Sequence, residues 1–143
     1  MNYTPLQVKT NYSLLSSLND IKKLVAEAKK YGYDSLAITD ENNMFGVMEF
    51  YLECKKNNIK PIIGIELTYD NAILLLYAKN LQGYKNLIKL ATIKSDEKLT
   101  YDDLITYKEE LILMKKYITY IKINILDILI MKKEKTLKKN QSL

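Results

Sequence analysis

Three acidic residues follow, or end, two stretches that the sequence predicts to be buried strands. Asp40 and Glu41 come directly after the apolar run of residues 35–39, and Glu66 lies near the end of residues 62–67. Sites in α/β folds gather at the carboxyl ends of the strands, so we expect these carboxylates to lie close together, where they could hold a divalent cation. Spacing alone favours a structural role, in which Asp40 and Glu41 cap the following turn or helix and Glu66 pairs with a lysine.

The composition excludes several kinds of catalytic site. The chain has 143 residues and no histidine, which removes the commonest general base and the Ser-His and Cys-His nucleophile pairs. A single cysteine, Cys54, excludes an internal disulfide and a CxxC zinc site, and its place on the inner side of a predicted helix favours packing. Four glycines are present, and none of them forms a phosphate-binding loop.

The positive net charge gives little support to nucleic-acid binding. All 22 basic residues are lysines, so the chain has no arginine for bidentate contacts to phosphate or guanine. Most of the net charge of +5 belongs to residues 117–143, where six lysines face two acids. The twelve tyrosines fit amphipathic packing better than base stacking. The composition therefore gives no argument for direct contact with DNA in this part of the chain.

The sequence predicts a cytoplasmic protein without membrane contact. Its longest apolar stretch, residues 117–131, is 15 residues long and is interrupted by Lys122, Asn124 and Asp127. A membrane span needs about 20 mostly apolar residues. The N-terminus also lacks the charged start and the apolar core of a signal peptide.

Strand and helix patterns alternate along the chain. Strands are predicted at residues 3–9, 35–39, 62–67, 72–78 and 111–114, and helices at about residues 20–31, 45–57, 81–93 and from 101 onward. Ser17 or Asn19 is the expected cap of the first helix, and Asp70-Asn71 is typical of a hairpin turn. Such repeated units predict an α/β fold with mostly parallel strands and outer helices, as a barrel or an open sheet.

Four segments carry motifs in a fixed order. Residues 6–16 read LQVKTNYSLLS, residues 37–46 read AITDENNMFG, residues 59–67 read IKPIIGIEL, and residues 78–87 read AKNLQGYKNL. Together they resemble the PHP domain at the N-terminus of bacterial replicative DNA polymerase III alpha subunits. The resemblance covers about residues 3–114 and implies a distorted seven-stranded β/α barrel, of which this chain supplies four or five strands.

The metal-binding positions of that family carry other residue types here. The family uses two histidines and an aspartate in the first motif, and a histidine in the second. The matching positions are Gln7, Lys9, Ser16 and Glu41, whereas Asp40 and Glu66 are retained. Because the ammonium group of Lys9 would repel a metal ion, the resemblance implies vestigial ligand positions and no catalytic residue. No cofactor is expected beyond a weakly held, mostly hydrated magnesium ion.

These observations divide the chain into two parts. Residues 1–114 are predicted to form a partial PHP-like domain, and residues 115–143 a divergent lysine-rich tail that is helical or disordered.

The leading functional hypothesis is a fragment or short relative of the DNA polymerase III alpha subunit. Its PHP module would be catalytically inactive, with a structural or partner-docking role in DNA replication. Its expected partners are other segments or subunits of the replicative polymerase. Two alternatives stay open: a metal-dependent phosphoesterase with a minimal carboxylate site, and a stand-alone binding protein on the PHP scaffold.

Overall fold

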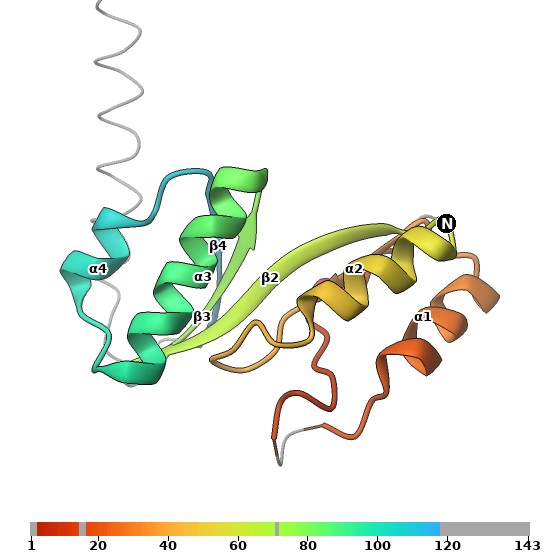
Figure 1. Ribbon diagram of the computed structural model, residues 1–143, viewed down its shortest axis with the longest axis horizontal. Helices are drawn as coiled ribbons and strands as arrows, with labels where there is room; N and C mark the ends of the chain where they lie inside the picture. The colour runs from red at the N-terminus through yellow and green to blue at the C-terminus, as the bar shows by residue number, and fades with distance from the viewer. Residues whose placement is uncertain (1–2, 15–16, 71, 118–143) are drawn as a thin grey trace, which may run out of the picture.

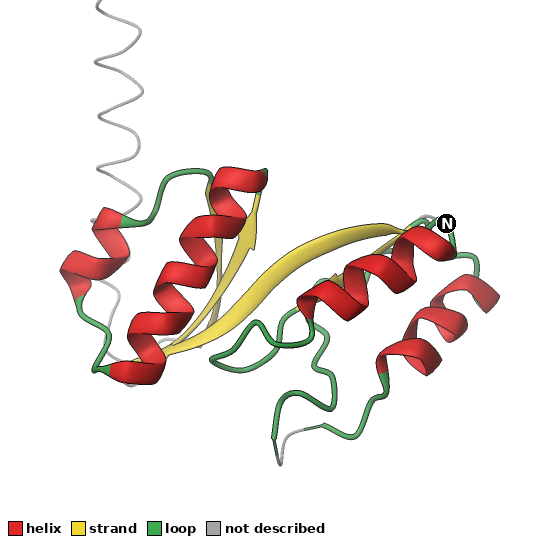
Figure 2. Cartoon of the chain, in the orientation of Figure 1, coloured by secondary structure: helices red, strands yellow, loops and turns green. Residues whose placement is uncertain are grey.

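The computed structural model describes residues 3–14, 17–70 and 72–117, which form a four-stranded sheet with helices packed on it (Figures 1 and 2). The elements in chain order are α1 (Ile21–Lys30), β1 (Ser35–Ile38), α2 (Val47–Lys56), β2 (Lys60–Tyr69), β3 (Ala72–Ala78), α3 (Leu81–Asp96), α4 (Tyr101–Thr106) and β4 (Leu111–Tyr117). The sheet order is β1-β2-β3-β4. The predicted mixed α/β class is confirmed.

The prediction of mostly parallel strands is wrong for the part of the chain that the structure describes. Only β1 and β2 run parallel, with Ser35 opposite Lys60, whereas the β2–β3 and β3–β4 pairs are antiparallel. A tight turn at Asp70, whose φ is +48°, joins β2 directly to β3 as a hairpin. Between β3 and β4 the chain passes through two helices instead of one. β4 begins beside the end of β3, where Ala78 pairs with Leu111, so these two strands run antiparallel.

Side-chain caps begin three of the described helices. Asp20, not Ser17 or Asn19, is the cap of α1, and its carboxylate accepts a hydrogen bond from the Lys23 amide. Asn80 caps α3 in the same way. Thr100 and the third residue of α4, Asp103, form a reciprocal capping box.

One apolar cluster joins α1 and α2 to β1 and the first half of β2. Ile21 and Val25 of α1, Phe50 of α2, and Leu36 and Ile38 of β1 are each at most 1% exposed. The inner faces of α1 and α2 are buried in this cluster, whereas Tyr51 of α2 is 41% exposed. The two helices fix the position of the β1 carboxyl end.

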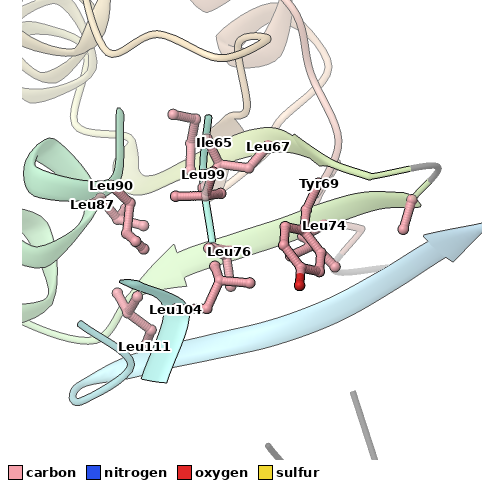
Figure 3. Packing of buried hydrophobic residues seen from close by; sticks show 11 residues of the cluster. Ile65, Leu67, Tyr69, Leu74, Leu76, Leu87, Leu90, Leu99, Leu104 and Leu111 are labelled. Atoms are coloured by element: carbon pink, nitrogen blue, oxygen red, sulfur yellow. The ribbon is translucent and has the colours of Figure 1, made fainter. Parts of the chain in front are cut away.

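A second cluster joins α3 and α4 to the antiparallel part of the sheet. Figure 3 shows Leu87 and Leu90 of α3 and Leu104 of α4 on the side of the sheet that carries Leu74 and Leu76 of β3. The opposite face of the sheet therefore carries the alternate residues of β3, Leu75 and Tyr77, which are also buried.

The predicted boundary after residue 114 falls inside β4, which continues to Tyr117. The rest of the predicted tail, residues 118–143, lies outside the described residues, as does Ser16.

Candidate functional site

The N-terminal segment brings its polar residues beside the carboxyl end of β1. The Pro5 and Val8 carbonyls accept hydrogen bonds from the amides of Ala37 (3.2 Å) and Thr39 (2.8 Å). The Val8 amide in turn donates to the Thr39 hydroxyl at 2.9 Å. Residues 3–9 are thus extended along β1 without forming the regular strand predicted for them. This alignment carries Gln7 and Lys9 to the predicted carboxylates.

Asp40 is buried and fully occupied by hydrogen bonds from the preceding loop. It is 2% exposed, and its carboxylate accepts from the Thr10 amide (2.6 Å), the Thr10 hydroxyl (2.7 Å) and the Ser13 hydroxyl (2.7 Å). The carboxylate therefore caps the loop of residues 10–13. Among the described residues these donors precede Asp40 in the chain, whereas the sequence predicted that Asp40 would cap the turn or helix that follows it.

Lys9 lies between two carboxylates. Its Nζ is 3.1 Å from Glu66 Oε1 and 3.2 Å from Glu41 Oε2. Gln7 Nε2 donates to the second oxygen of Glu66 at 3.0 Å. Glu66 is 1% exposed, so its buried charge depends on these two partners. The expectation that Glu66 pairs with a lysine is confirmed.

The electrostatics of the cluster keep Lys9 protonated. Burial by itself lowers the pKa of the Lys9 ammonium, but the hydrogen bonds and charges of Glu66 and Glu41 outweigh it. The pKa of Lys9 is therefore raised from its ordinary 10.5. At neutral pH the cluster contains one fixed positive charge held between two acidic side chains.

Backbone contacts tie Glu41 and Glu66 to neighbouring strands. The Glu66 amide donates to the Asp40 carbonyl at 3.0 Å, and the Asn42 amide donates to the Glu66 carbonyl at 2.8 Å. Glu66 stands opposite Leu75 in the β2–β3 pair, on the sheet face away from α3. Burial, and then the charge of Glu66, raises the pKa of Tyr77 on the same face.

The structure brings together four of the six predicted positions and places a fifth next to them. Gln7, Lys9, Glu41 and Glu66 share one network, and Asp40 is adjacent through the backbone with a separate set of donors. Thr10 and Ser13, which hold Asp40, were missed by the sequence analysis. Their only signal was a pair of hydroxyl residues three apart in a polar segment after a predicted strand.

This donor set differs from that of a cation site. Among residues 3–14, 17–70 and 72–117, no three histidine, cysteine or acidic side chains converge in a way that could hold a metal ion. The Lys9 ammonium stands where a cation between Glu41 and Glu66 would stand, and the oxygens of Asp40 face Thr10 and Ser13. In this cluster the Lys9 ammonium neutralises the buried Glu66 carboxylate. The residues therefore do not fit a divalent metal ion.

No helix in the described part of the chain is long and apolar enough to cross a membrane.

The fold has a counterpart among solved structures. A protein from Bifidobacterium adolescentis, described as a metal-dependent phosphoesterase, superimposes with a TM-score of 0.53 at 16% sequence identity. The superposition covers 75% of this chain and 43% of that one. At this identity the likeness concerns the fold alone.

Curated relatives are more similar in sequence. The DNA polymerase III subunit alpha of Bacillus subtilis is 40% identical over 122 residues, which cover 78% of this chain and 11% of the relative. The same subunit of Halalkalibacterium halodurans is 38% identical over 127 residues, with 82% and 11% covered. That of Borreliella burgdorferi is 41% identical over 128 residues, with 75% and 11% covered. The chain therefore spans about 11% of the length of these relatives.

The similarity to these relatives lies in their N-terminal region. The sequence model of the PHP domain matches residues 5–138, nearly the whole chain. The four motifs described above, which lie in order within residues 6–87, agree with that match. This chain belongs to the PHP domain family.

Proposed function

We propose that this chain is the PHP module of a replicative polymerase of the subunit alpha type and carries out no phosphoester chemistry itself. It acts in the cytoplasm, in DNA replication, as a structural element on which other polymerase segments or subunits dock. The relatives that it matches are DNA polymerase III alpha subunits, and the similarity lies in their N-terminal region. Direct contact with DNA is not part of the proposal.

The observation that carries the proposal is the position of Lys9. A phosphoesterase of the metal-dependent kind needs cations that polarise the phosphate and activate water. In this chain an ammonium group fills the space between the carboxylates of Glu41 and Glu66, and histidine is absent from the sequence. Vestigial status is accordingly proposed for Gln7, Lys9, Ser16, Asp40, Glu41 and Glu66.

Metal binding tests the proposal directly. We expect isothermal titration with Mn²⁺ to give no tight site on the purified chain, and at most weak, hydrated binding of Mg²⁺. The variant Gln7→His/Lys9→His/Glu41→His removes the ammonium group of Lys9. It also supplies imidazoles at the three positions where the family pattern has histidine. We expect the same titration to detect tight Mn²⁺ binding by this variant. One or more tightly held manganese ions per unmodified chain would contradict the proposal.

Hydrolysis distinguishes the proposal from its enzyme alternative, a phosphoesterase that uses a minimal site of Asp40, Glu41 and Glu66. We expect no release of phosphate from p-nitrophenyl phosphate and no shortening of a 3′-labelled DNA strand above background. The matched control is Glu66→Gln, which keeps the shape of the side chain and removes its charge. Hydrolysis by the unmodified chain that disappears in Glu66→Gln would establish the alternative.

A further inference from the structure

An apolar groove lies between α2 and α3, on the far side of α2 from α1. Its walls come from Met48 and Tyr51 of α2 and from Leu81 and Tyr84 of α3, and its floor includes Ile63 of β2. The volume is about 410 Å³, within the range of protein binding pockets. Figure 2 shows α2 and α3 over different parts of the long strand β2, and the lining residues place the groove between them.

The walls of this groove expose large apolar side chains. Met48 is 59% exposed, Tyr51 41% and Leu81 66%, and Leu52, one turn after Met48, is 59% exposed. The opposite stripe of α2 already packs into the core through Phe50. A helix that faces solvent on its outer side normally carries polar residues there. A contiguous apolar patch of this kind is typical of an interaction surface.

Two lysines lie at the groove, and one acidic residue, Glu110, accepts a hydrogen bond from the lining Asn80. Lys79 lines the groove, and Lys55 Nζ lies 5.6 Å from the centre of the Tyr51 ring. The acidic residues of α2 face other partners: Glu49 accepts a hydrogen bond from the Tyr12 hydroxyl, and Glu53 accepts from Asn57. A partner with carboxylates beside its apolar side chains would therefore find complementary charge.

The groove continues along α3. Tyr84 also lines a neighbouring hollow of about 580 Å³, which extends past Ile88 and Ala91 toward Asp96 and includes the exposed Phe45. The 16 residues of α3 span about 24 Å at the usual helical rise. This length suits a short peptide segment better than a small molecule.

We infer that the groove binds an acidic, amphipathic segment of a partner protein. Its apolar side chains enter between Tyr51 and Leu81, and its carboxylates pair with Lys55 and Lys79. This inference names the partner chemistry for the docking role and rests on the proposed function in that respect. A second copy of the chain fits less well, because a symmetric contact would bring the same lysines together. Nucleic acid fits less well because the lining is mostly apolar.

Selection with a peptide library tests the inference. The full chain is immobilised and offered a phage library of random 12-residue peptides, and an enriched peptide is synthesised with a fluorophore for anisotropy. We expect enriched sequences to combine Leu, Phe or Met with Asp or Glu. Leu81→Ser and Lys55→Glu/Lys79→Glu should each weaken binding at least tenfold, and the affinity of the unmodified chain should fall as salt rises.

Matched controls separate the groove from general surface effects. Leu18→Ser removes a side chain that is 97% exposed outside the groove, and Lys22→Glu reverses an exposed charge on α1. Both should bind the peptide like the unmodified chain, and circular dichroism should show every variant folded.

Three results would overturn the inference: no enrichment, enrichment of basic or uncharged peptides, or binding unaffected by the groove variants. Concentration-dependent dimerisation in sedimentation that Leu81→Ser abolishes would assign the groove to a second copy and also overturn it. Mn²⁺ binding or hydrolysis by the unmodified chain bears on the proposed function alone, so the two can fail separately.

Discussion

Lys9 neutralises a buried carboxylate, and its removal leaves the Glu66 carboxylate with the Gln7 amide as its side-chain partner among the described residues. We expect Lys9→Met to lower the free energy of unfolding by about 2–4 kcal/mol, somewhat less than for a fully buried pair, because the Lys9 side chain is 24% exposed. Glu41→Gln is the control, because the Glu41 side chain is 36% exposed and the same lysine contact should contribute less than about 1 kcal/mol there. Urea unfolding measures both, and equal losses would contradict the assignment.

Alkaline pH should weaken the fold through the same lysine. A lysine whose pKa is raised on folding contributes fully below its unfolded value of 10.5, and this contribution is lost as pH rises through the folded value. Burial and Glu66 raise the pKa of Tyr77 from 10.0, which acts in the same direction. Urea midpoints should therefore stay level to about pH 9 and fall above about pH 10. Lys9→Met should show a shallower fall, and a rise above pH 10 would refute this account.

Cys54 should be chemically inert in the folded chain. It is fully buried, and burial, with a smaller effect from Glu53, raises the pKa of its thiol to about 12. The thiolate is the reactive form, so a disulfide reagent at pH 8 should label the thiol only after unfolding in urea. Rapid labelling of the native protein would show that the helix α2 packs less tightly than described.

At the scale of elements, Gly64 stands where β2 changes partners from β1 to β3. A Cβ atom there would lie 2.8 Å from the Leu76 carbonyl oxygen and 2.8 Å from the Tyr77 ring. Because a backbone oxygen cannot move aside cheaply, Gly64→Ala should cost about 1–3 kcal/mol of stability. Gly32→Asn is the comparison, since Gly32 has a φ of +73° with open space around it and asparagine tolerates that conformation. Thermal melts that rank the two variants in the opposite order would refute the steric argument.

Local patterns predicted the elements better than their directions. The positions of α1, α2 and α3 depend on patterns within a few residues of sequence, so the sequence was sufficient to predict them. Strand direction depends on what joins the strands. The sequence predicts a hairpin turn at Asp70-Asn71, and a hairpin makes its two strands antiparallel. The prediction of mostly parallel strands rested instead on the alternation of strands and helices along the chain.

The sequence predicted which acidic residues lie at the candidate site, but it did not predict their hydrogen-bond partners. The proximity of Asp40, Glu41 and Glu66 follows from adjacent strand ends. The donors Thr10 and Ser13 come from an irregular loop that has no hydrophobic period, so no sequence pattern fixes where its hydroxyl groups point.

At the scale of the whole molecule, β4 is the last strand of the described sheet. β2 and β3 each have a strand on both sides, whereas β4 pairs with β3 alone within residues 3–117, and its Ile112 and Met114 are 46% and 42% exposed. We expect hydrogen exchange to be slowest in β2 and β3 and faster in those β4 amides that do not donate to β3. Equal protection of all β4 amides would show that another segment or another molecule pairs with this strand.

The length of β2 has a consequence for how the fold is lost. Its first four residues pair with β1, and its last six pair with β3. Ile63, in the middle, packs against both apolar clusters. Unfolding of either cluster therefore disrupts β2, which the other cluster also needs for its packing. The two clusters should behave as a single cooperative unit, in which damage to the helices of one side is felt by the hairpin on the other.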